Sequence, residues 1–235
     1  MSKTLNILVA QQNPVVGDIE GNLALAMETL KQAEASSADL AVLSEFFILG
    51  YPPEDLVLKP SAVENAMAAI RRLAEATANH TAGVIIGGPW TEAGKRYNSA
   101  FLLSGGDIVW RTNKRELPNY GVFDEKRVFD EGEGAAKAIE YKGVRLGIAI
   151  CEDIWFERVP RELAEDGAEL LIVPNASPWR RTIQTERHTT FSSWQKNGLP
   201  YLFVNQVGGQ DELVFDGSSY AVDVDGTEHQ LLGDF

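Results

Sequence analysis

The chain has 235 residues, of which 44% are hydrophobic and 23% are charged, and these values suit one large globular domain over residues 1–235. Acidic residues number 34 and basic residues 21, so the net charge of −13 argues against nucleic acid or an anionic membrane as a partner. The single cysteine excludes an intramolecular disulfide framework. Because no signal peptide is evident and no apolar run approaches the roughly 18 residues that span a bilayer, we expect a cytoplasmic protein.

The first half of the chain alternates apolar, strand-like runs with two amphipathic helices. Pro89 is expected to end the third strand, because proline cannot donate a backbone hydrogen bond. Residues 104–107, Ser-Gly-Gly-Asp, are interpreted as a hairpin turn between the fourth and fifth strands. The expected strands are 5–10, 40–43, 84–88, 97–103 and 108–112, and the expected helices are 22–35 and 62–78.

The second half opens with residues 116–134, which show no regular pattern, and a loop of this length is typical of a functional segment. A buried strand then begins at residue 144 and leads to Cys151. The remaining expected elements are helices 160–166 and 185–197, strands 170–173 and 202–205, and a strand pair within 214–224. Strands that alternate with helices and hairpins indicate an α/β sandwich rather than a barrel.

Three polar residues each follow a predicted strand: Glu45, Lys114 and Cys151. The carboxyl ends of strands are where α/β sheets place their crevices, so these side chains could converge there. A thiol needs a base or a positive neighbour to become a nucleophile, and Glu45 could take the proton of Cys151. Lys114 and the backbone N–H of Glu152 could hold the oxyanion of an acyl transfer. The alternative from spacing alone is an inert cysteine beside an ordinary ion pair.

Longer motifs surround these residues. They are LSE at 43–45, KRELPNYGVFDEKR at 114–127, CEDIW at 151–155, NASP at 175–178, NQVGGQDE at 205–212 and FDGSS at 215–219. In this order they resemble the nitrilase superfamily of carbon–nitrogen hydrolases and, within it, the glutamine-hydrolysing domains of glutamine-dependent NAD synthetases. The resemblance covers nearly the whole chain and implies an αββα four-layer sandwich.

Carried over onto the matching motifs, the resemblance implies that Cys151 is the nucleophile, Glu45 the base and Lys114 the oxyanion lysine. It also implies a substrate pocket for glutamine, to which we assign Tyr120, Phe123, Glu125, Glu152 and Ser177. The hydrolysis itself is expected to need no cofactor. The three histidines show no metal-ligand spacing, so no metal site is expected either.

The chain departs from the family pattern behind the residue that matches the glutamine-binding serine. Family members place a basic residue five to six positions after this serine, and that residue holds the α-carboxylate of glutamine. Here those positions are Thr182 and Ile183. The arginines that could substitute are Arg180, Arg181 and Arg187.

A second departure is the lack of the Ser-Gly-Gly-x-Asp-Ser loop with which the synthetase domain of the family binds pyrophosphate. We therefore expect an excised domain that stops before the last strand of the sandwich, with ATP and Mg²⁺ needed only in the absent synthetase domain. The expected partners are glutamine, that synthetase domain and further copies of the chain in a homo-oligomer.

Two other functions stay open. Because Ile183 replaces a basic residue, a stand-alone amidase or carbamoylase that acts on another small amide is an alternative. A catalytically idle scaffold is a third possibility, from a different functional class. Ammonia release from a panel of amides and nitriles would separate the three.

Overall fold

Two β-sheets lie face to face in the structure, a computed structural model that describes residues 4–194 and 198–235. The first sheet consists of β1 (Ile7–Val9), β2 (Leu40–Val42), β3 (Gly83–Glu92), β4 (Lys95–Ser104) and β5 (Asp107–Asn113). Its strands follow one another in chain order, with β1, β2 and β3 parallel and the later pairs antiparallel. The turn between β4 and β5 has left-handed glycines at positions 105 and 106, as its Ser-Gly-Gly-Asp sequence predicts.

The second sheet is built from the later part of the chain. Its strands are β6 (Ile139–Tyr141), β7 (Val144–Ile148), β8 (Leu170–Asn175), β9 (Tyr201–Asn205), β12 (Tyr220–Val222) and β13 (Glu228–Gln230). Their order is β13-β12-β9-β8-β7-β6, and β9, β8 and β7 are parallel to one another. A separate antiparallel pair is formed by β10 (Val207–Gln210) and β11 (Leu213–Asp216). The carboxyl ends of β2, β5, β7 and β8 carry the segments that form the site described below.

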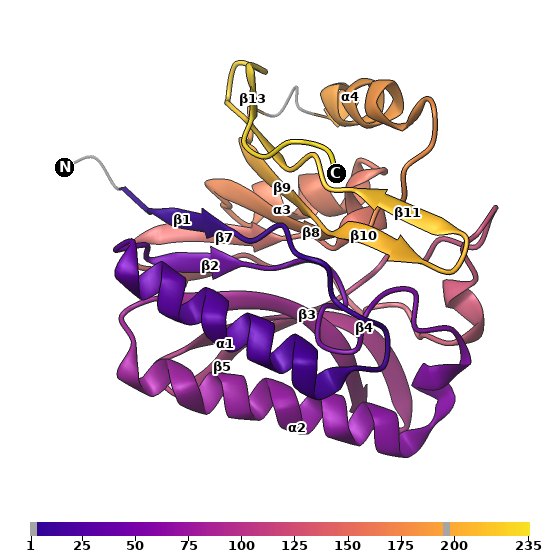
Figure 1. Ribbon diagram of the computed structural model, residues 1–235. Coiled ribbons are helices and arrows are strands. Elements are labelled where there is room, and N and C mark those ends of the chain that lie inside the picture. The colour runs from indigo at the N-terminus through magenta and orange to yellow at the C-terminus, as the bar shows by residue number, and fades with distance from the viewer. Residues whose placement is uncertain (1–3, 195–197) are drawn as a thin grey trace.

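Helices cover the outer face of each sheet, which gives the predicted αββα order of layers (Figure 1). The first sheet is covered by α1 (Ile19–Ala35) and α2 (Pro60–Ala76), and the second by α3 (Arg158–Glu165) and α4 (Ile183–Trp194). Helix α1 begins where the Asp18 side chain accepts the backbone N–H of Gly21 at 3.0 Å. Helix α2 begins with Pro60, whose missing N–H costs nothing in the first turn.

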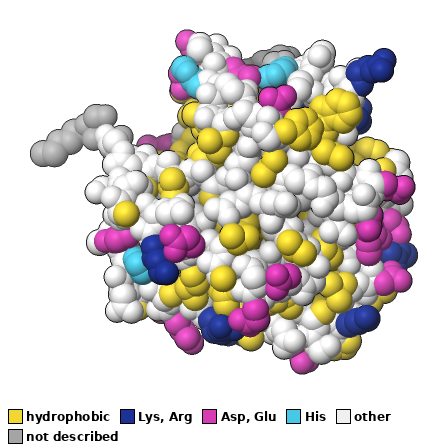
Figure 2. Space-filling model, viewed as in Figure 1, with side chains coloured by type: hydrophobic (Ala, Val, Ile, Leu, Met, Phe, Trp, Pro, Cys, Tyr) yellow, Lys and Arg dark blue, Asp and Glu magenta, His cyan; other side chains and the backbone are white. Residues whose placement is uncertain are grey.

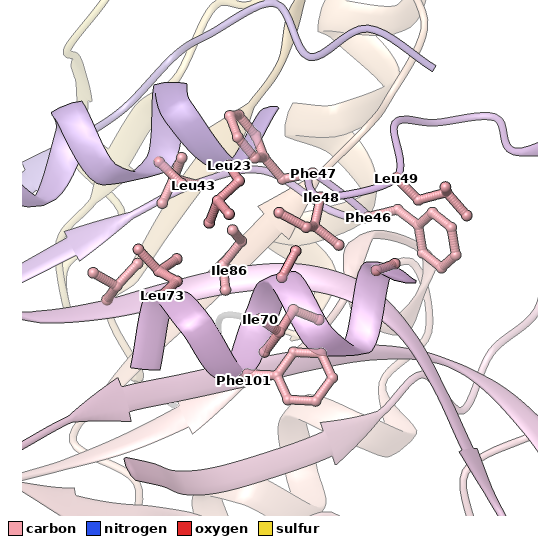
Figure 3. Packing of buried hydrophobic residues seen from close by; sticks show 14 of the residues in the cluster. Leu23, Leu43, Phe46, Phe47, Ile48, Leu49, Ile70, Leu73, Ile86 and Phe101 are labelled. Carbon is pink, nitrogen blue, oxygen red and sulfur yellow. The ribbon is translucent and has the colours of Figure 1, made fainter. Parts of the chain in front are cut away.

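Three apolar clusters fill the spaces between the four layers. Strand residues alternate between them with a period of two: in β4, Ala100 and Leu102 face the other sheet, whereas Phe101 and Leu103 face the helices. Figure 3 shows the cluster between the first sheet and its helices, where Leu23 of α1 and Ile70 and Leu73 of α2 surround strand and loop residues. The cluster between the sheets holds the two halves of the chain together, with Leu40, Ile85, Leu146 and Ile172 among its members.

The surface carries both charged and apolar side chains. Figure 2 shows acidic side chains spread over the face in view with basic ones between them, so the charge of −13 is not gathered into one patch on this face. Within residues 4–194 and 198–235, no helix has the length and apolar character required for a membrane span.

The expectation that Pro89 ends the third strand is wrong, because β3 continues to Glu92. Strand β3 pairs with β2 only as far as Ile85, whereas its pairing with β4 extends along its whole outer part. Proline is tolerated where a strand has a paired neighbour on one side only, because on the unpaired side no carbonyl group of a neighbouring strand requires a backbone N–H donor.

The expected strand pair within residues 214–224 is also wrong in one respect. Two strands are present, but β11 pairs with β10, and β12 pairs with β9 and β13. Gly217 and Ser218 between them have φ angles of 70° and 52°, and this left-handed stretch redirects the chain from one strand set to the other. The short strands β6, β10 and β13 were not predicted. Positions 195–197 of the expected helix 185–197 lie outside the described residues.

Candidate active site

The structure brings the three predicted catalytic residues to the same end of the two sheets. Glu45 lies just beyond β2, Lys114 directly follows β5, and Cys151 begins the short 3-10 helix η4 (Cys151–Ile154) beyond β7. The backbone φ angles of Phe46 and Cys151 are 52° and 45°. Such left-handed conformations at residues other than glycine cost about 1–3 kcal/mol and are concentrated at functional sites.

The Lys114 ammonium group joins two carboxylates in the interior. Its Nζ lies 2.7 Å from Glu45 Oε1 and 2.7 Å from Glu125 Oε1, and these side chains are 0–4% exposed. Asn98 Nδ2 also donates to Glu45 Oε1 at 2.8 Å, and the Tyr51 hydroxyl donates to Glu125 Oε1 at 2.8 Å. An ordinary surface ion pair, the alternative from spacing alone, does not fit this burial.

The second sheet contributes to the same cluster. The backbone N–H of Ala176 donates to Glu45 Oε2 at 3.0 Å, and the N–H of Glu45 donates to the carbonyl of Asn175 at 3.3 Å. Asp153, in the turn that carries Cys151, accepts the N–H groups of Arg115 and Glu116, each at 2.8 Å. Hydrogen bonds from main-chain N–H groups therefore join the Glu45 segment to the segment after β8, and join the Lys114 segment to the turn that carries Cys151.

Burial controls the protonation of this cluster. It raises the pKa of the Cys151 thiol well above its ordinary value; the nearby Glu45 charge adds to this, and Lys114 opposes it. Burial alone would lower the pKa of Lys114, but the charges of Glu125 and Glu45 outweigh it and raise that pKa well above its ordinary value. A protonated thiol beside a firmly charged ammonium group suits a mechanism in which a neighbouring carboxylate removes the thiol proton during attack.

Glu125 is held in an environment that favours its neutral form. Burial, together with repulsion from Glu45, raises its pKa from 4.5 to about 7 against the opposing effect of Lys114. Its Oε2 atom is buried and has no hydrogen-bond partner within the described part of the chain. This oxygen is therefore an acceptor left unsatisfied inside the buried cluster.

A pocket of about 350 Å³ opens above Cys151. Five of the predicted residues line it, namely Tyr120, Phe123, Cys151, Glu152 and Ser177. Glu45, Lys114 and Glu125 do not line it and form the buried cluster described above. All eight predicted site residues thus belong to one region of the molecule.

Three side chains in contact form one wall of the pocket. The Tyr120 hydroxyl lies 2.9 and 3.1 Å from the two carboxylate oxygens of Glu152, and its ring packs edge-on against Phe123 with centroids 5.5 Å apart. Burial raises the pKa of Glu152. The wall therefore presents an acidic group that can accept hydrogen bonds from a cationic or amide-bearing ligand.

Ser177 is positioned from behind by a buried ion pair. Arg187 Nη1 lies 3.0 Å from Asp216 Oδ2, and both side chains are 0% exposed. Arg187 Nη2 donates to Ser177 Oγ at 3.0 Å, and Asn205 Oδ1 accepts the N–H of Ser177 at 2.9 Å. Because Arg187 is fixed in this network, it is a poor candidate for binding a substrate carboxylate.

The other positions considered for that carboxylate differ in their surroundings. Ile183 is 3% exposed and lines the pocket, so an apolar side chain occupies the predicted clamp position. Arg180 lines the pocket as well, whereas Arg181 is exposed and does not. Thr182 donates from its hydroxyl to Glu186.

Sequence reasoning missed the supporting residues Tyr51, Asn98, Asp153, Arg115 and Asp216. A signal existed for three of them, because Arg115 lies in the quoted motif at 114–127, Asp153 in CEDIW and Asp216 in FDGSS. Asn98 lies in the polar first half of β4, where its sequence gives no specific signal. Nothing in the local sequence of Tyr51 indicates that its hydroxyl reaches Glu125.

The comparisons with known proteins agree with this geometry. The sequence matches the carbon–nitrogen hydrolase family over residues 7–229. It is 40% identical over 228 residues to a glutamine-dependent NAD(+) synthetase of Rhodobacter capsulatus, covering 97% of this chain and 41% of that protein. It is 40% identical over 235 residues to the enzyme of the same name from Xanthomonas campestris, covering 99% of this chain and 42% of that protein.

Among solved structures, the glutamine-dependent NAD+ synthetase of Acinetobacter baumannii in complex with ADP superposes with a TM-score of 0.92 at 36% identity, covering 98% of this chain and 44% of that one. An amidase from Nesterenkonia sp. superposes with a TM-score of 0.87 at 25% identity, covering 100% of this chain and 89% of that one. The chain spans about two fifths of the length of the curated synthetases that it matches. With the family matched along nearly the whole chain and the nitrilase-type sandwich reproduced, the chain belongs to the carbon–nitrogen hydrolase family.

Proposed function

We propose that this chain hydrolyses the side-chain amide of glutamine through a thioester on Cys151 and releases ammonia. The observation that carries the proposal is the Lys114 ammonium group, held 2.7 Å from both Glu45 and Glu125 in the interior behind the pocket. The charge of Glu45 raises the pKa of the Cys151 thiol and the charge of Lys114 lowers it, which supports a role for both groups at this nucleophile. A base and an oxyanion-stabilising cation beside one thiol are what thioester chemistry requires.

The proposed reaction has two stages with balanced proton transfers. Glu45 accepts the thiol proton as Cys151 Sγ forms a bond to the amide carbon, and Lys114 with the Glu152 backbone N–H stabilises the oxyanion. The carbon–nitrogen bond then breaks, and the nitrogen leaves as ammonia with the proton that Glu45 held. A water molecule next gives a proton to Glu45 and attacks the thioester carbon. The carbon–sulfur bond then breaks, glutamate leaves, and Glu45 returns the proton to Sγ to restore the thiol.

The wider role of the ammonia is part of the same proposal. The curated relatives are synthetases more than twice as long as this chain, and the ammonia would serve conversion of deamido-NAD to NAD in a synthetase domain. ATP and Mg²⁺ would be needed in that domain, and no cofactor in this one. A single domain over residues 1–235, a homo-oligomer and a cytoplasmic location also stay predictions.

An amidase for another small amide is the second candidate. The specific observation in its favour is Ile183, whose apolar side chain lines the pocket where the resemblance predicts a cation. The likeness to the Nesterenkonia amidase over the whole chain agrees with this alternative. The two candidates differ in substrate and share the same nucleophile.

The test is ammonia release from glutamine, asparagine, an N-carbamoyl amino acid, a nitrile and a simple aliphatic amide. We expect glutamine to be preferred, and Cys151→Ala to abolish release while leaving thermal unfolding nearly unchanged, because only one sulfur atom is removed. Preference for an aliphatic amide would favour the second candidate. Turnover by Cys151→Ala within tenfold of the wild type would refute a thioester on this residue.

A further inference from the structure

The pocket above Cys151 carries one acidic and one basic side chain among the described residues that line it. Glu152 is acidic and 5% exposed, and Arg180 is basic with a side chain that is 51% exposed. The other lining residues are uncharged, and most are apolar or aromatic. A pocket with one group of each sign suits a ligand that carries both a cationic and an anionic group.

Arg180 is engaged by a residue of the neighbouring helix rather than buried in the pocket wall. Its guanidinium group contacts the Glu186 carboxylate through both Nη atoms. Glu186 lies in the first turn of α4 and also accepts the Thr182 hydroxyl at 2.5 Å. An exposed pair of this kind is worth little, so a ligand carboxylate can compete with Glu186 for the guanidinium group.

The charge of Arg180 also acts on the far wall of the pocket. Burial and the Glu152 carboxylate raise the pKa of Tyr120, and the positive charge of Arg180 opposes that rise. Arg180, Tyr120 and Glu152 all line the same pocket, so the charge of Arg180 and the acidic wall face one ligand site.

Ser177 presents a second donor three residues before Arg180. Arg187 donates to Ser177 Oγ from Nε at 3.3 Å and from Nη2 at 3.0 Å, so this oxygen acts as an acceptor on its buried side. The hydroxyl hydrogen of Ser177 is then left to donate into the pocket that the residue lines. Arg187 itself is neutralised by Asp216 and cannot serve a ligand.

We propose that Arg180, with the Ser177 hydroxyl beside it, binds the α-carboxylate of the substrate, and that Glu186 holds Arg180 until this carboxylate displaces it. This inference rests on the proposed function, because it takes the substrate to be the amide of an amino acid. Glu152 and Tyr120 face the α-ammonium group in this arrangement. Arg180 is then the residue that distinguishes an amino-acid amide from a neutral one.

Three substrates separate the two charges of the ligand. L-Glutamine has both, glutaramate keeps the carboxylate and lacks the ammonium group, and L-glutamine methyl ester keeps the ammonium group and lacks the carboxylate. Losing a hydrogen-bonded partner of a charged group costs about tenfold to a hundredfold in affinity. We expect Arg180→Met to raise KM by this factor for glutamine and glutaramate, to leave KM for the ester unchanged, and to change kcat little.

The matched control is Arg181→Met, which removes an exposed guanidinium group next in the chain that does not line the pocket. It should leave all three KM values unchanged. Glu186→Gln frees Arg180 and should lower KM for the two carboxylates several-fold. Ile183→Lys in the Arg180→Met background should restore glutamine binding by supplying a cation from the pocket wall.

Failure of this inference and failure of the proposed function give different results. If glutamine is hydrolysed and Arg180→Met changes all three KM values equally or none of them, the inference is overturned while the proposed function stands. If no substrate is hydrolysed, the proposed function fails, and calorimetric titration of Cys151→Ala with glutaramate then decides the inference by itself. Glutaramate binding that weakens in Cys151→Ala/Arg180→Met supports it, and equal or undetectable binding in both variants overturns it.

Discussion

Gly87 of β3 lies against the segment that carries Glu45, and this contact leads to a sharp prediction. A Cβ atom at position 87 would lie 2.1 Å from Phe46 N, 2.7 Å from Glu45 C and 2.9 Å from Glu45 Cα. The glycine also donates its N–H to the carbonyl of Ser44 at 3.3 Å and accepts the N–H of Ile48 at 3.1 Å. The missing side chain therefore lets the backbone beside Glu45 approach the strand closely.

The size of the disturbance follows from these distances. Ordinary van der Waals contact of a Cβ begins at 3.4 Å, so Gly87→Ala must move the chain beside Glu45 by about 3.4 − 2.1 = 1.3 Å. Overpacking of this kind costs about 1–3 kcal/mol of stability. A misplacement of about 1 Å at a reacting group costs about a hundredfold in rate. We expect Gly87→Ala to fold with reduced stability and to lose about a hundredfold in kcat/KM.

The measurements are urea unfolding and steady-state ammonia release, and Gly88→Ala is the control. A Cβ at Gly88 would meet side-chain atoms, Ile48 Cγ2 at 2.6 Å and Ile70 Cδ1 at 2.8 Å, rather than the backbone of Glu45 and Phe46. That variant should lose a similar amount of stability and keep most of its activity. The positioning argument is refuted if Gly87→Ala retains kcat/KM within about threefold of the wild type, or if Gly88→Ala loses as much activity.

Two further predictions concern stability. Burial raises the pKa of Glu125 from 4.5 to about 7, so the Glu125 carboxyl binds a proton more tightly in the folded chain than in the unfolded chain. This difference stabilises the fold by about 3 kcal/mol. The contribution is complete below pH 4.5 and is lost as the pH rises through about 7. Urea unfolding at pH 5 and 8 should therefore show a smaller loss for Glu125→Gln than for the wild type, and equal losses would contradict the assignment. Asp216→Asn leaves Arg187 buried without its counter-ion and should destabilise the fold by about 3–5 kcal/mol in urea, whereas Glu20→Gln, at an exposed pair, should change little.

The elements and the catalytic cluster could be predicted because their signals are local. The predicted sheet strands are mainly apolar segments bounded by turn-forming or polar residues. Glu45, Lys114 and Cys151 lie where three of these segments end. The structure confirms that Lys114 meets Glu45, since both follow strands of one sheet and point to one end of it. The catalytic roles themselves stay predictions.

The parts that could not be predicted depend on contacts between distant segments. Strands β6 and β13 have three residues each, and only their partners β7 and β12 make them strands. The spacing of residues along α4 does not show which arginine near the pocket is buried. Arg187 is buried because it pairs with Asp216, which lies 29 residues away in the sequence. The same holds for Tyr51, whose hydroxyl meets Glu125 across 74 residues of sequence.

The division of the chain between the two sheets has a consequence for how the chemistry is assembled. Strands β1–β5 all precede residue 114 and β6–β13 all follow residue 138, so each sheet comes from one contiguous half of the chain. Glu45 and Lys114 belong to the first half and Cys151 to the second, with the apolar cluster of Leu40 and Ile172 between the sheets. Two separately produced fragments, cut between residues 127 and 138, would each be inert and would each expose an apolar face. Only reassociation of the two fragments would bring Glu45, Lys114 and Cys151 together. The recovered activity would therefore measure the amount of reassociated fragment complex.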